Sequence, residues 1–122
     1  MDTGFKSLKV YQLAYHVAMD IYEISRKFPK EEVYSLTDQI RRSSRSVCTN
    51  IAEAYRKRRY PKNFTSKISD ADGEASETIV WIDFSFNCGY FKQNIADELI
   101  QKAEEIGKIL NYMIQNPSKF IK

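Results

Sequence analysis

The chain has 122 residues, of which 43% are hydrophobic and 29% charged, with a formal net charge of +3 and only four Gly and three Pro. This composition is typical of one soluble, helix-rich domain that is large enough to bury a core without a metal or disulfide. No apolar run approaches the roughly 18 residues of a membrane span. Two unpatterned cysteines, Cys48 and Cys88, and no secretory signal predict a cytoplasmic protein with reduced thiols.

Apolar residues recur at steps of three and four in four stretches, which indicates four amphipathic helices. Breaks containing Pro29, Pro61 and Pro117 separate or end these stretches, because proline cannot continue a helical hydrogen-bond ladder. Ser35, with Asp38 three residues later, resembles a capping box at the start of the second helix. The predicted helices span residues 8–28, 35–58, 62–89 and 94–116.

Short connections between these helices leave no room for crossovers, so neighbours along the chain are expected to pack against each other in opposite directions. The predicted fold class is all-α. Residues 1–122 are expected to form a single domain, folded as an antiparallel up-down-up-down four-helix bundle.

Positive charge is concentrated in one segment of the chain. Between Arg41 and Lys62 lie eight of the nineteen Lys and Arg residues, with Glu53 as the only acid. Residues 1–40 and residues 63–122 are each net negative. A charge concentrated in this way makes a local positive field that attracts phosphates or an acidic partner.

A basic face is predicted along the second helix and the loop after it. At 100° per residue, Arg41, Arg45 and Arg56 lie opposite the apolar stripe, as they also would on an ordinary solvated face. Five cations within seven residues at the end of this helix repel one another, which favours a polyanion or acidic surface as partner. The candidate nucleic-acid-binding residues are Arg41, Arg45, Arg56, Lys57, Arg58, Arg59 and Lys62. Two tyrosines flank these cations, Tyr55 and Tyr60. They are candidates either for stacking on unpaired bases or for ordinary packing within the protein.

Two other predicted surfaces are not explained by a bundle core. A polar stripe on the second helix is expected to form a hydrogen-bonded seam against an adjacent helix, with a polar active site as the alternative. Its residues are Gln39, Arg42, Ser46, Asn50 and Glu53. On the third helix, Val80, Trp81 and Phe84 project away from the core stripe. Such an apolar cluster indicates a subunit interface, unless connections of the same chain cover it.

Sequence motifs for catalysis and metal binding are missing. His16 is the only histidine, so no centre requiring two imidazoles can be built within one chain. The sequence has no Gly-rich phosphate loop, no nucleophile paired with a base and no carboxylates clustered toward one pocket. We therefore expect no enzymatic activity, no cofactor and no metal site.

Several motifs are shared with one known family. They are Phe5-Lys6-Ser7-Leu8-Lys9-Val10-Tyr11-Gln12-Leu13-Ala14, Phe28-Pro29 with Glu32 and Tyr34, Leu36 with Gln39, Arg42, Ser46, Val47 and Asn50-Ile51-Ala52-Glu53, and Ala71, Gly73, Glu77 and Gly89-Tyr90. Over nearly all of residues 5–115, the chain resembles a four-helix-bundle family encoded in intervening sequences of bacterial large-subunit ribosomal RNA, also labelled ribosomal-protein-like. Two positions depart from the family pattern: Ala54 replaces the usual Gly, and Glu74 replaces the usual Ser.

The resemblance implies an up-down helical bundle. Some relatives accompany diversity-generating reverse transcriptases. The resemblance to these relatives implies a ring-like homopentamer whose basic surface engages nucleic acid and the polymerase. For most members the cellular role is unknown. We therefore expect a homo-oligomer, pentameric by the resemblance, that binds RNA or another nucleic acid through its basic face. The alternative is a protein-interaction scaffold that docks an acidic partner such as a polymerase.

Overall fold

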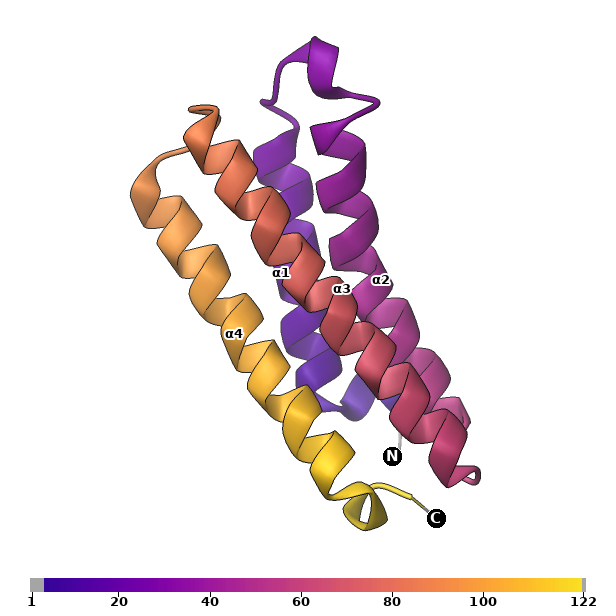
Figure 1. Ribbon diagram of the computed structural model, residues 1–122. Coiled ribbons are helices and arrows are strands. Elements are labelled where there is room, and N and C mark those ends of the chain that lie inside the picture. Colours follow the sequence, from indigo (N-terminus) through magenta and orange to yellow (C-terminus); the bar gives the residue numbers. More distant parts are fainter. Residues whose placement is uncertain (1–3, 122) are drawn as a thin grey trace.

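Four helices form the body of the computed structural model, which describes residues 4–121 (Figure 1). They are α1 (Lys9–Ser25), α2 (Leu36–Arg56), α3 (Pro61–Asn87) and α4 (Gln93–Gln115). Three short 3-10 helices accompany them: η1 (Gly4–Ser7), η2 (Lys30–Glu32) and η3 (Pro117–Lys119). No strand occurs in this described part of the chain, so the fold is all-α.

The four helices lie side by side around a shared core. α1 packs on α2, α2 on α3, α3 on α4, and α4 in turn packs on α1. The α1–α2 and α3–α4 connections lie at one end of the molecule, whereas the α2–α3 connection, η1 and η3 lie at the other (Figure 1). Each helix therefore contributes one apolar stripe to the common interior.

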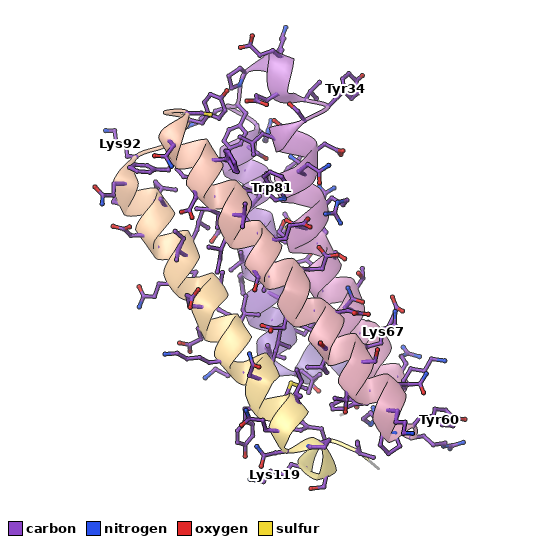
Figure 2. The ribbon with its side chains drawn as sticks, in the orientation of Figure 1. Tyr34, Tyr60, Lys67, Trp81, Lys92 and Lys119 are labelled. Atoms are coloured by element: carbon purple, nitrogen blue, oxygen red, sulfur yellow. The ribbon has the colours of Figure 1, made fainter. Side chains whose placement is uncertain are left out.

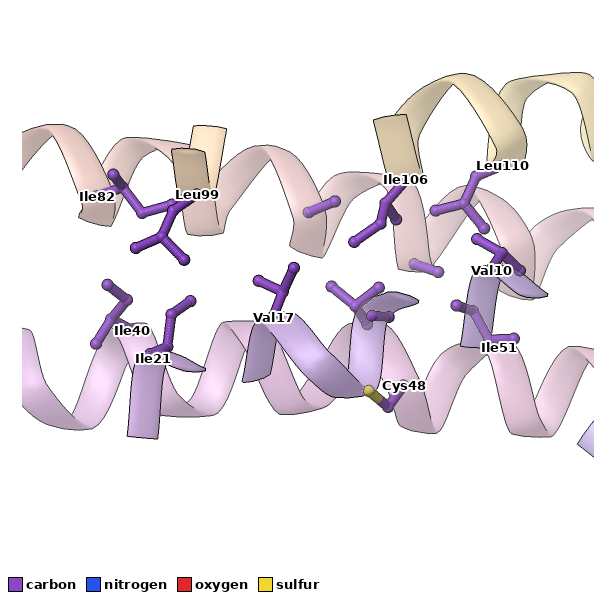
Figure 3. Close-up of a cluster of buried hydrophobic side chains, with 14 of the residues drawn as sticks. Val10, Val17, Ile21, Ile40, Cys48, Ile51, Ile82, Leu99, Ile106 and Leu110 are labelled. Carbon is purple, nitrogen blue, oxygen red and sulfur yellow. The ribbon is translucent and has the colours of Figure 1, made fainter. Parts of the chain in front are cut away.

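Layers of branched aliphatic side chains fill this interior. Figure 3 shows Ile21 and Ile40, from α1 and α2, opposite Ile82 and Leu99, from α3 and α4. Burying each such side chain contributes about 1.5–3 kcal/mol, which makes this core the main source of stability. The large side chains that are almost completely buried include Ile21, Ile40, Ile51, Phe64, Ile68, Ile82, Leu99, Leu110 and Met113.

α1 ends at Ser25, three residues before the predicted end of the first helix. Residues 26–28 form a turn, and this turn brings the buried Phe28 ring back onto the bundle. The ring centroid of Phe28 lies 5.2 Å from that of Tyr90 and 6.2 Å from that of Phe91, both in the α3–α4 connection. Packing at the end of the bundle thus takes the place of a last helical turn.

The expected capping box of Ser35 and Asp38 does not form, because Glu32 takes its place. The Ser35 side chain makes no capping bond to the helix and instead donates to Glu32 Oε1 at 2.6 Å. The backbone N–H of Leu36 donates to the same oxygen at 3.3 Å. A carboxylate at this end of a helix satisfies unpaired N–H groups and interacts favourably with the helix dipole.

Glu32 also links the two connections at this end of the bundle. The Tyr90 hydroxyl donates to Glu32 Oε2 at 2.7 Å. The hydrogen bonds from Ser35 and Tyr90 lower the pKa of the Glu32 carboxyl, because they stabilise its charged form. The bond to Glu32 likewise raises the pKa of Tyr90 to about 12. The segment between α1 and α2 is thus fixed against the segment between α3 and α4.

Candidate nucleic-acid interface

Five of the seven predicted nucleic-acid-binding residues lie at the C-terminal end of α2 and the start of α3. We call them the terminal cluster: Arg56, Lys57, Arg58, Arg59 and Lys62. All are exposed except Arg58, which is half-buried. The Arg56 guanidinium lies 5.6 Å from the Phe5 ring centroid, and that of Arg58 lies 3.7 Å from the Tyr55 ring centroid. Aromatic faces therefore hold two of these cations in place.

The two tyrosines of this region differ in their surroundings. Tyr55 is half-buried beneath Arg58, which also donates through Nη1 to the Tyr55 carbonyl oxygen at 3.2 Å. Tyr60 is exposed at the edge of the molecule (Figure 2). Of the pair, only Tyr60 presents a largely free ring for stacking on a base.

The other two predicted residues, which we call the arginine pair, lie in the N-terminal half of α2. Arg41 Nε donates to Ser25 Oγ at 2.7 Å, and its guanidinium lies 4.9 Å from the Tyr22 ring centroid. Arg45 approaches the same ring, at 5.8 Å. Arg41 lies opposite the apolar stripe of α2, but its side chain is half-buried because it lies along the neighbouring surface of α1. Arg45 is exposed, as expected.

None of these seven cations forms an ion pair with a carboxylate of residues 4–121. The partners observed for Arg41, Arg45, Arg56 and Arg58 are aromatic rings, a hydroxyl and a carbonyl oxygen, none of which carries a negative charge. At 100° per residue, the positions of Arg41 and Arg56 differ by about 60° around the axis of α2, so the two residues lie on the same side of the helix. Arg45 and Arg56 are separated by eleven residues, or about 16 Å along the helix. The seven cations thus form two groups, the arginine pair in the N-terminal half of α2 and the terminal cluster at its C-terminal end and the start of α3.

The predicted polar seam lies between α2 and α3. Arg42 forms ion pairs with Glu77 and, at 3.6 Å, with Glu74. Glu53 pairs with Lys67 of α3 at 3.1 Å between Oε2 and Nζ. Both charged seam residues therefore have partners on the adjacent helix, and Glu74, one of the departures from the family pattern, is one of them. The uncharged seam residues bond locally: Gln39 accepts from Arg42 Nε at 3.3 Å, and Asn50 donates to the Ser46 carbonyl at 2.9 Å.

The apolar cluster on α3 is exposed in part. Val80 is 47% exposed and Phe84 55% exposed, as the helical spacing predicts. Trp81 differs, because it is half-buried, packs against the core and donates from Nε1 to Glu77 at 3.4 Å. The Trp81 and Phe84 rings lie 5.9 Å apart and line a shallow groove of about 480 Å³ together with Tyr34 and Leu36.

The only histidine and the two cysteines of the sequence differ in their exposure. His16 is exposed on α1. Both cysteines are free thiols, Cys48 buried and Cys88 exposed. Among residues 4–121 no group of three or more potential metal ligands is found. Likewise, none of the helices described has both the length and the apolar character needed to traverse a lipid bilayer.

The sequence did not identify the α1 residues that orient the arginine pair, Tyr22 and Ser25. Thr37 and Asp38 of α2, which line the same surface depression as the arginine pair, were also missed as site residues. Their proximity depends on how α1, α2 and the connection between them meet, which a helical repeat does not reveal.

Comparison with known proteins places this geometry in a family. A family model described as 23S rRNA-intervening sequence protein matches residues 6–112. A similar crystal structure, from Bacteroides thetaiotaomicron VPI-5482, is described as a protein with unknown function from the S23 ribosomal protein family. The two chains are 25% identical, with a TM-score of 0.79, over 87% of this chain and 95% of the other. No curated protein matches the chain. The family model covers most of the sequence, and the chain belongs to the 23S rRNA-intervening sequence protein family.

Proposed function

We propose that this protein is a non-enzymatic, homo-oligomeric RNA-binding protein. In this proposal, an antiparallel up-down-up-down bundle displays the arginine pair and the terminal cluster toward RNA phosphates in the cytoplasm. The observation that carries it is the absence of carboxylate partners for all seven cations within residues 4–121. The family's description, which refers to an intervening sequence of 23S rRNA, supports RNA as the polyanion.

Electrostatics favours a polyanion at this surface. Clustered like charges repel one another, and an anionic ligand relieves this repulsion when it binds. Phosphates bound by Lys and Arg release counterions, so affinity falls as salt rises and depends little on base sequence. The four exposed cations of the terminal cluster, with one phosphate each, give a slope of log K against log salt of about −2.8 to −3.6. Their residues are Arg56, Lys57, Arg59 and Lys62.

Oligomerisation is the second part of the proposal. The groove lined by Trp81 and Phe84, with Val80 nearby, is an exposed apolar surface of the kind that marks contacts between proteins. We propose that a second copy of the chain covers Val80, Trp81 and Phe84 and leaves the Tyr34 ring exposed, in a ring of subunits whose pentameric form comes from the family resemblance. A ring repeats one weak RNA site several times and raises the overall affinity without further contacts in each subunit.

RNA binding is tested with a variant whose four exposed terminal-cluster cations are replaced, Arg56/Lys57/Arg59/Lys62→Ala. Arg58 is kept, because its half-buried side chain packs on Tyr55. A matched control removes four exposed lysines elsewhere, Lys9/Lys27/Lys92/Lys108→Ala. In an RNA-binding assay at low salt, we expect the cluster variant to lose affinity and the control to keep most of it. Equal binding by wild type and the cluster variant would refute the proposal. Recovery of a protein partner that survives nuclease treatment would favour the acidic-partner scaffold instead.

The subunit interface is tested separately by placing a charge in the apolar groove. Phe84→Glu changes an exposed residue and is not expected to disturb the core, whereas Trp81→Glu also affects packing within the chain. We expect both variants to lower the mass measured by light scattering. An unchanged mass for Phe84→Glu, with helical content preserved, would place the interface elsewhere.

A further inference from the structure

A shallow groove of about 610 Å³ runs along the N-terminal half of α2 beside the connection from α1. Its lining includes the arginine pair, two residues that the proposed function does not use, Thr37 and Asp38, and Tyr34, which also borders the apolar groove. It is separate from the terminal cluster, which lies at the opposite end of α2. The groove therefore combines guanidinium groups, an aromatic ring and a carboxylate in one place.

The arginine pair has the features of a phosphate clamp. Arg41 and Arg45 are four residues apart on a helix, a spacing at which like charges destabilise each other. Both nevertheless approach the one ring of Tyr22, and Ser25 holds Arg41 through Nε alone. The terminal nitrogens of both guanidinium groups form no hydrogen bond with residues 4–121, so their N–H donors remain available. A phosphate between the two groups accepts these bonds and removes the repulsion.

Tyr34 is the most exposed large hydrophobic residue described, at 93% of its surface, and yet it comes from a well-fixed segment. The N–H of Val33 bonds to the Lys30 carbonyl at 3.1 Å, and that of Ser35 bonds to the Glu32 carbonyl at 3.0 Å. Glu32 itself is held by Ser35, Leu36 and Tyr90. Figure 2 shows Tyr34 at the α1–α2 end, pointing away from the bundle. An aromatic ring presented in this way offers a stacking surface whose position is already set.

Two further residues restrict how a ligand can lie in the groove. Thr37 is only 5% exposed, but its hydroxyl has no hydrogen-bond partner among residues 4–121. A threonine hydroxyl in a helix often donates to the backbone carbonyl four residues earlier. For Thr37 that carbonyl belongs to Val33, which lies outside α2. This hydroxyl is an unused donor on a residue that lines the groove. Asp38 repels phosphate, which confines the anion to the end of the groove formed by Arg41 and Arg45.

We infer that this groove binds one unpaired nucleotide of RNA, with its phosphate between Arg41 and Arg45 and its base stacked on Tyr34. This inference rests on the proposed function and adds to it a preference for single-stranded loops or bulges. A base inside a duplex is stacked between its neighbours and cannot offer a free face to Tyr34. The terminal cluster, about 16 Å further along α2, binds phosphates of paired and unpaired RNA alike.

The test compares a hairpin RNA that has an unpaired loop with a blunt duplex of equal phosphate number, using fluorescence anisotropy. Wild type is expected to bind the hairpin more tightly. Tyr34→Ala is expected to weaken hairpin binding about tenfold and to leave duplex binding unchanged, since one stacked base is worth about 1–3 kcal/mol. Tyr34→Phe keeps the ring and should keep the preference. Tyr15→Ala removes another exposed tyrosine, outside the groove, and serves as the matched control.

The clamp is tested with Arg45→Ala, because Arg45 is exposed and makes no contact with the core. This variant should lose hairpin preference as Tyr34→Ala does, and light scattering should show that both keep the mass of wild type. If both variants retain the full preference for the hairpin while RNA binding stays sensitive to salt, the inference fails and the proposed function stands. If wild type binds neither RNA at low salt, both fail. Tight binding of a free nucleoside monophosphate, without hairpin preference, would also overturn the inference and indicate a metabolite site.

Discussion

Replacing Gly73 with alanine should stabilise the protein, even though the residue lies within the longest helix. Gly73 is exposed in the middle of α3, and a Cβ atom added there meets nothing within 4 Å. Alanine is more favourable than glycine in a helix interior by about 0.8–1.0 kcal/mol, because glycine loses more backbone entropy on folding. With no contact to oppose it, the substitution should raise the free energy of unfolding by about that amount.

The expected change in melting temperature follows from the size of the chain. Unfolding entropy of about 2.1 cal/mol/K per residue gives about 0.26 kcal/mol/K for 122 residues. A gain of about 1 kcal/mol therefore raises Tm by about 4 °C, which differential scanning calorimetry or thermal circular dichroism resolves.

Replacing Gly89 with alanine should have the opposite effect and destabilise the protein. Its φ of +81° lies in the left-handed region, where a side chain costs about 1–2 kcal/mol. Gly89→Ala should therefore lower Tm by about 4–8 °C. A lower Tm for Gly73→Ala would refute the reasoning, since it would mean that another segment or chain packs against Gly73. If another subunit packs against Gly73, the Gly73→Ala substitution also weakens the subunit interface. Light scattering would then show a lower mass for Gly73→Ala than for wild type.

Two further predictions concern titration and thiol chemistry. Glu32 has a lowered pKa in the folded state, so its contribution to stability is present above its usual pKa of about 4.3 and is lost as pH falls through the lower folded value. Glu32→Gln should thus lower Tm at pH 7 and have little effect near pH 2, whereas an equal loss at both values would contradict this reasoning. Burial raises the pKa of Cys48 to about 11, whereas Cys88 is exposed. A thiol reagent at pH 8 should label one cysteine rapidly and the second only on unfolding, and Cys88→Ser should abolish the rapid phase. Two rapid reactions in the native protein would show that Cys48 is accessible.

The positions of the helices could be predicted from sequence because proline and apolar periodicity are local signals. Pro61 begins α3 and Pro117 follows α4, close to the predicted limits. The helix ends were less accurate where tertiary contacts decide them. α1 stops at Ser25 because Phe28 packs on Tyr90, a contact between segments more than sixty residues apart. Glu32 caps α2 in place of the expected Ser35 pair for a similar reason, since Tyr90 also holds its carboxylate.

The cations of the candidate site could be predicted, but their orientation could not. A helical repeat gives the direction of a side chain relative to its own axis, and it places Arg41 on the outer side of α2. It does not show that α1 lies close enough for Arg41 to reach Ser25 and Tyr22. The same limit explains Trp81, which packs partly against the core although its position on α3 indicates solvent.

The salt dependence of RNA affinity tests the central claim most directly. Affinities of wild type and of the terminal-cluster variant for one RNA are measured between about 50 and 200 mM salt, over which phosphate-dominated binding weakens steeply. We predict that log K falls with log salt in wild type, and that the slope is shallower in the variant by about 0.7–0.9 for each cation removed. A wild-type affinity that does not change with salt, or an identical slope in both proteins, would contradict phosphate binding by these side chains.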